Sequence, residues 1–110
     1  MVGDKIKENI EYDILLMRNP SSTKEIAEMV ELMTEVVSSK RSSIRLDKQE
    51  IPQKMVKDRL LSLQCEHIEY VLESMKNSSS KIHNIRAYLL TALYHAPETI
   101  HNYYAAGFRE

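Results

Sequence analysis

The chain is nearly free of the two residues that most often interrupt regular backbone structure: its 110 residues contain only two glycines and three prolines. An all-β domain needs a turn roughly every 8–12 residues, and such turns draw heavily on Gly and Pro. Helices make no such demand. The sequence therefore favours an all-α fold, and its length fits a single domain at residues 1–110. We expect a compact bundle of five to six helices.

Apolar residues recur every three or four positions in the first forty residues, the spacing of one buried helix face. A first helix is predicted at 5–17, and Pro20 ends that segment. Ser22 and Glu25 have the spacing of a capping box, which predicts the start of a second helix extending to about Lys40. The buried face of the first helix is expected to consist of Ile6, Ile10 and Ile14, and that of the second of Ile26, Val30, Met33 and Val37. Glu28, Glu31 and Glu35 are expected to face water.

The helical period is interrupted after the second helix. Ile44 and Leu46 alternate with polar residues, and Asp47-Lys48 can turn the chain back. A short extended segment or miniature hairpin is therefore predicted near 41–51. Pro52 suits the first turn of the helix that follows, where its missing N–H costs nothing.

Four more helices complete the predicted bundle. The helix after Pro52 should bury Met55, Val56 and Leu60, and after a break at 62–64 the next should bury Cys65, Ile68, Leu72 and Met75. A polar loop is predicted at 77–80. The following helix, apolar on nearly all sides, should bury Ile82, Ile85, Leu89, Ala92 and Ala96, with Tyr88 and Tyr94 in the core or at its edge. Pro97 is expected to open the last helix.

Residue patterns typical of catalysis are absent from the sequence. The four histidines form no i, i+4 pair and no HExxH motif, and the two glycines, Gly3 and Gly107, cannot make a phosphate-binding loop. Cys65 lies on an apolar stripe and is interpreted as a small buried hydrophobe. We therefore predict no enzymatic activity, no cofactor and no metal. The single cysteine and the lack of an apolar run long enough for a membrane span or a signal peptide predict a cytoplasmic protein without membrane contact.

Charge is distributed in blocks although the net charge is only −1. Residues 1–39 carry net −4, 40–60 net +4, 61–73 net −3 and 74–97 net +3. If the basic blocks share a face, that face can follow a phosphate backbone; the alternative is that neighbouring acidic and basic blocks neutralise one another. The candidate DNA-binding residues are Lys40, Arg41, Arg45, Lys54, Lys57, Arg59, Lys76, Lys81 and Arg86.

Three aromatic residues near the end of the chain are candidates for partner binding. Tyr103, Tyr104 and Phe108 can stack on bases or anchor a protein partner, and packing of the last helix onto the bundle explains them equally well. Both interpretations stay open at this point.

Several segments together resemble one known protein family. KIHNIRAYLLTALYHAPETIHNYY (81–104) carries most of the resemblance, supported by 6–15, 25–37, 44–63 and 67–75. In this order and spacing they resemble a domain of unknown function at the C-terminal end of RepA-type replication initiators from plasmids and integrative elements of Gram-positive bacteria. The asparagine followed by AYLLTALY is also similar, more weakly, to the helical C-terminal domain of the DnaD primosome proteins.

The resemblance implies a place in DNA replication. In such initiators an N-terminal winged-helix domain recognises the origin, and the C-terminal domain engages the host machinery. A chain of this length has no room for the winged helix, so origin recognition is not expected. We expect a non-catalytic interaction module that recruits a host replication protein of the helicase loader, helicase or primase class, with non-specific DNA binding as a second activity. The alternative is a structural or homo-oligomerisation domain without nucleic-acid contact.

Overall fold

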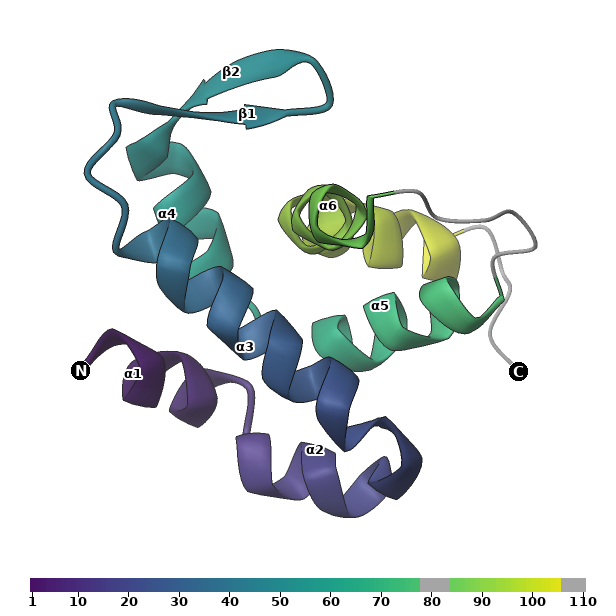
Figure 1. Ribbon diagram of the computed structural model, residues 1–110. Coiled ribbons are helices and arrows are strands. Elements are labelled where there is room, and N and C mark those ends of the chain that lie inside the picture. The colour runs from purple at the N-terminus through teal and green to yellow at the C-terminus, as the bar shows by residue number, and fades with distance from the viewer. Residues whose placement is uncertain (78–83, 106–110) are drawn as a thin grey trace.

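The computed structural model describes residues 1–77 and 84–105, with side chains up to residue 101. Over these residues the chain forms six α-helices, a short 3₁₀ turn and a two-stranded antiparallel hairpin (Figure 1). The elements are α1 (Val2–Asn9), α2 (Tyr12–Arg18), η1 (Pro20–Ser22), α3 (Thr23–Val37), β1 (Ser43–Leu46), β2 (Gln49–Pro52), α4 (Gln53–Leu61), α5 (Cys65–Lys76) and α6 (Ile85–Ala105). The predicted compact, mostly helical architecture with a small hairpin is confirmed.

Helix α3 runs through the middle of the fold and packs against α1, α4 and α6. The predicted stripe is buried, with no member more than 5% exposed: Ile26, Val30, Met33 and Val37. The three glutamates predicted to face water are exposed. The helix ends at Val37, three residues before the predicted end.

The prediction of a single helix at 5–17 is wrong, because the chain forms two helices that meet at Glu11. This residue adopts a left-handed conformation, with φ 55° and ψ 58°, which ends one helix and starts the next in a new direction. The break brings Leu15 into the core, where it is 0% exposed, and leaves Ile14 45% exposed. Ile6 and Ile10 are buried as predicted.

The capping box predicted at Ser22 and Glu25 is also wrong. Ser22 is the N-cap of α3, but its side chain makes no capping hydrogen bond, and its backbone N–H donates to Asn19 O at 3.0 Å within the preceding turn. A reciprocal cap forms instead at the start of α5, between Gln64 and His67.

The hairpin has the predicted position and turn. Asp47 and Lys48 have φ of 48° and 69°, so both central residues are left-handed, as in the type I′ turns that suit the twist of a two-residue hairpin. Ile44 pairs with Ile51 across the strands. The Gln53 side-chain amide donates to the Val36 and Val37 carbonyls at 3.2 and 3.1 Å, which fixes the base of the hairpin to the end of α3.

Helices α4 and α5 follow with the break predicted at 62–64. Val56 and Leu60 are buried as expected, whereas Met55 is 53% exposed. Val56 and Leu60 are four residues apart and define the buried face of α4, so Met55, one position earlier, turns away from the core. The face predicted for α5 is confirmed, with Met75 only partly buried at its end.

Pro97 lies inside α6. The prediction that it opens a separate last helix is therefore wrong. A proline removes one backbone hydrogen bond and bends a helix, and Figure 1 shows α6 changing direction towards its yellow C-terminal part. Leu89 and Ala96 are buried as predicted, whereas Ile85, in the first turn, is 46% exposed. The polar loop at 77–80 and Ile82 lie almost wholly outside the described residues.

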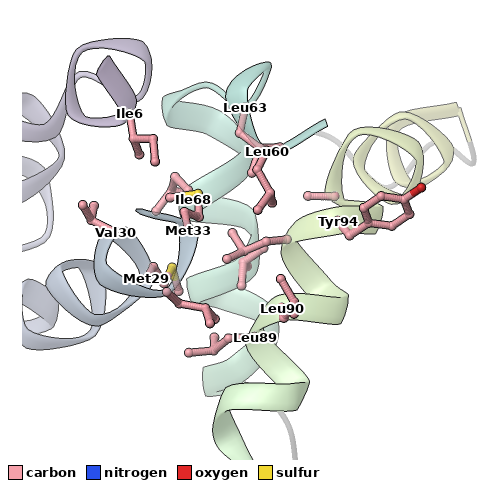
Figure 2. Close-up of a cluster of buried hydrophobic side chains, with 14 of the residues drawn as sticks. Ile6, Met29, Val30, Met33, Leu60, Leu63, Ile68, Leu89, Leu90 and Tyr94 are labelled. Carbon is pink, nitrogen blue, oxygen red and sulfur yellow. The ribbon is translucent and has the colours of Figure 1, made fainter. Parts of the chain in front are cut away.

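Side chains from all six described helices meet in one hydrophobic core, part of which is drawn in Figure 2. Members that are at most 1% exposed include Ile6 of α1, Met33 of α3, Leu60 of α4 and Ile68 of α5. Tyr94 of α6 is 5% exposed, and its hydroxyl points away from the cluster (Figure 2). The same core therefore supports the elements that carry the charged surfaces described below.

Candidate nucleic-acid interface

The first basic block of the sequence forms one continuous stretch of surface, the basic edge. It follows the chain from the end of α3 through the hairpin to the first turns of α4, at the top of the molecule in Figure 1. Its exposed members are Lys40, Arg41, Arg45, Lys48, Lys54 and Lys57. The cations lie close together because β2 passes into α4 without an intervening loop.

The hairpin decides which way its cations point. Ile44 and Leu46 are buried, so the alternation along β1 turns Arg45 outwards. Lys48 occupies the second position of the turn and is exposed. Lys48 belongs to the basic block at 40–60 but is not one of the candidate residues predicted from the sequence, although the Asp-Lys turn signal predicts its position at the hairpin tip.

Two of these cations are paired locally. Arg45 Nη1 lies 3.3 Å from Glu50 Oε2, and Lys54 Nζ lies 3.2 Å from Asp58 Oδ2. A hydrogen bond from the Ser43 hydroxyl, together with Arg45, lowers the pKa of Glu50. Exposed pairs of this kind contribute little to stability and exchange readily for other partners.

The remaining four cations of the basic edge have no ion pair within the described part of the chain: Lys40, Arg41, Lys48 and Lys57. Their charge is therefore available to an external anion. No ion pair in the described part of the chain joins these cations to a carboxylate of α5, and one of those carboxylates, Glu69, accepts hydrogen bonds from Arg18 and Asn19 at 2.8 and 3.0 Å.

Arg59 is directed into the fold. Its Nη1 donates to the Tyr94 carbonyl at 2.9 Å, and its guanidinium carbon lies 4.5 Å from the centre of the Tyr94 ring. Both interactions join α4 to α6 one turn before Pro97. Arg59 is thus a link between two helices, which its position in a basic block did not reveal.

The second basic block does not extend the basic edge as a group. Arg86 Nη2 pairs with Glu35 Oε1 of α3 at 2.7 Å, and Lys76 is exposed at the C-terminal end of α5. Lys81 lies outside the described residues. The same holds for Phe108 and for the side chains of Tyr103 and Tyr104, although α6 includes the backbone of both tyrosines.

The surroundings of Cys65 and His67, at the start of α5, indicate structural roles for both side chains. Cys65 is buried as predicted, and burial raises the pKa of its thiol. His67 Nδ1 accepts a hydrogen bond from the Gln64 backbone N–H at 2.9 Å, and partial burial lowers the pKa of the imidazole. Because Nδ1 accepts this bond only when unprotonated, the neutral imidazole stabilises the helix cap.

The described residues include neither a cluster of metal-binding side chains nor a membrane-spanning helix. No three His, Cys, Asp or Glu side chains there come together in a group able to hold a metal ion. None of the helices in those ranges is both long enough and apolar enough to cross a membrane.

Comparison with protein-family models places the chain in one family. No curated protein and no solved structure matches it. A family of unknown function, DUF6017, matches residues 2–109, and because this is nearly the whole length of 110 residues, the chain belongs to that family.

Proposed function

We propose that the chain is a non-catalytic interaction module of a DNA replication initiator and that its basic edge contacts the DNA phosphate backbone. The observation that supports DNA contact is the group of four exposed cations without an ion pair, held together by the hairpin and α4. The link to replication is supported by the resemblance of residues 6–104 to the C-terminal domains of RepA-type initiators and, more weakly, of DnaD.

The chemistry of the edge fits phosphates better than bases. Lysine and arginine side chains on exposed elements neutralise backbone charge and release counterions, a contribution that does not depend on base sequence. The edge has no recognition helix bearing the Asn or Gln side chains that read base edges: α4 has one glutamine, Gln53, and its amide is bonded to α3. We therefore propose binding without sequence preference.

Fluorescence anisotropy with a labelled duplex and a labelled single strand tests this activity. Contact through four phosphates predicts that log K falls with log salt with a slope of about −3 to −4 on duplex DNA. Lys48→Ala and Lys57→Ala should each reduce that slope by about 0.9. Lys24→Ala, which removes an exposed lysine from α3, is the matched control and should leave the slope unchanged.

Failure of both DNAs to bind at about 50 mM salt would overturn DNA contact, and so would equal weakening by Lys24→Ala. The first result is the one expected of the alternative function, a structural or homo-oligomerisation domain.

We also propose that the module recruits a host replication protein of the helicase loader, helicase or primase class. This rests on the resemblance to the RepA-type domain, and its candidate residues are Tyr103, Tyr104 and Phe108. Titration of each purified protein class, one at a time, into the labelled chain tests it. Saturable binding by one class supports recruitment, and the absence of binding by all three contradicts it.

A further inference from the structure

The two N-terminal helices enclose a groove on the surface opposite the hairpin. Its volume is about 500 Å³, and it lies in the angle between α1 and α2. Four carboxylates line it, from Asp4, Glu8, Glu11 and Asp13, together with Ile14, Tyr12 and one cation, Lys7, whose Nζ lies 4.8 Å from the centre of the Tyr12 ring. None of these carboxylates has an ion pair among residues 1–77 and 84–105. We call this surface the acidic groove.

Apolar side chains in and beyond the acidic groove are left uncovered by the fold. Ile14, which lines the groove, is 45% exposed, and Met17, one turn further along α2 and outside the lining, is 80% exposed. Their position follows from the left-handed backbone of Glu11, a conformation that is unfavourable for a residue with a side chain. An unfavourable backbone that turns large apolar side chains outwards is typical of a binding surface.

The chain itself carries a surface of the opposite character. On the outer face of α4, Met55 is 53% exposed. It follows Lys54, which pairs with Asp58, and lies two residues before Lys57, which has no ion pair among the described residues. An exposed apolar side chain near an unpaired ammonium group is the complement of an apolar side chain flanked by carboxylates. Figure 1 shows the N-terminal end of α4 and α2 at opposite ends of the molecule.

We propose that the acidic groove of one copy binds the outer face of α4 of a second copy, so that chains associate head to tail. Charge complementarity assigns the occupant: four carboxylates and one ammonium group line the groove, whereas residues 40–60 carry net +4. Because the two surfaces differ and lie at opposite ends, each pair leaves one of each kind free, and further copies add in the same way. The inference does not depend on DNA binding, although DNA and a second copy compete for Lys57.

Sedimentation velocity over a range of concentrations tests the association of the full chain. The wild-type average mass should rise with concentration at about 50 mM salt, and the association should weaken at least about tenfold at 0.5 M, where exposed charges are screened. Two variants separate the surfaces. The groove variant carries Glu8→Gln and Ile14→Gln, and the α4 variant carries Met55→Gln and Lys57→Gln. Glu28→Gln and Lys24→Gln on α3 are the matched controls.

The decisive measurement is a mixture of the two variants. Each variant alone should be monomeric, because it lacks one of the two surfaces, whereas their mixture should form a 1:1 dimer and nothing larger. Circular dichroism checks that each variant is folded. The control variants should associate like the wild type.

Three results would overturn head-to-tail association. These are a wild-type chain that stays monomeric at every concentration, a mixture that stays monomeric, and a single variant that still associates like the wild type. Binding of an unrelated basic peptide in the groove without self-association would also overturn the assignment to a second copy. The groove variant should keep wild-type DNA affinity, so this test and that of the proposed function fail independently.

Discussion

Replacement of Arg59 by alanine separates the stability of the fold from the function of the basic edge. Arg59 belongs to the basic block by sequence, but its guanidinium bonds the Tyr94 carbonyl and covers the Tyr94 ring. Arg59→Ala should therefore destabilise the protein and leave DNA affinity unchanged as long as the protein is folded.

The size of the effect follows from these two contacts. A hydrogen bond from a charged donor contributes about 1.5–3 kcal/mol, and a cation–π contact about 0.5–1 kcal/mol at an exposed site. Arg59 is only half-buried, so solvent offsets part of this gain, and we expect a loss of about 2 kcal/mol. For a chain of this length that corresponds to a fall in Tm of roughly 8 °C. Arg59→Lys keeps a cation near the ring but loses the guanidinium geometry, and should cost about half as much.

Thermal and urea unfolding followed by circular dichroism measure the stability, and anisotropy at 25 °C measures DNA binding. Lys57→Ala, two residues earlier on α4, is the matched control and should show the opposite pattern, with unchanged Tm and weaker DNA binding. The reasoning fails if Arg59→Ala changes Tm by less than about 2 °C. It also fails if Arg59→Ala weakens DNA binding as much as Lys57→Ala does.

Two further predictions concern the N-terminal half of the fold and the start of α5. Burial places the pKa of His67 below its usual value of 6.5, so the unfolded chain binds more protons than the folded one as pH falls through about 6.5. The free energy of unfolding, measured by urea unfolding at each pH, should therefore decrease from pH 7 to pH 5. In His67→Gln the part of this decrease that comes from protonation of His67 should be missing. A variant with the same pH profile as the wild type would contradict the role of His67. Glu11→Gly relieves the left-handed backbone between α1 and α2 and should raise the free energy of unfolding by about 1 kcal/mol, seen as a higher urea midpoint. A lower midpoint would show that the conformation of Glu11 is not strained.

Local patterns predicted those parts of the fold that depend on neighbouring residues alone. The apolar spacing in α3 defined its buried face, and the Asp47-Lys48 turn defined the hairpin. The break at Glu11 escaped prediction because no glycine or proline marks it: packing of Leu15 in the core outweighs the local preference for one continuous helix. Pro97 was assigned to a helix start, whereas the packing of α6 on both sides of it keeps the helix continuous with a bend.

In the candidate site, too, contacts between residues close in sequence were predictable and contacts between distant residues were not. The basic edge was predictable because its members are close in sequence, and the hairpin only folds them together. The pair of Arg86 with Glu35 and the contact of Arg59 with Tyr94 join residues far apart in the chain, so no local signal identified them. The distribution of charged residues along the sequence therefore predicts where the basic surface lies, but not which of its side chains are free to bind an external anion.

The buried thiol of Cys65 makes the start of α5 accessible to chemical measurement. The chain has a single cysteine, and its side chain is covered where α2 meets α5, with Arg18 Nη1 at 3.8 Å from Sγ. Cys65 is only 7% exposed, so a thiol reagent should react much faster when this junction opens, and the raised pKa of the thiol slows the reaction until then. Alkylation kinetics thus report the opening equilibrium of one helix junction without any introduced label. Slower alkylation when a ligand is added would show that binding elsewhere on the molecule tightens the junction between α2 and α5.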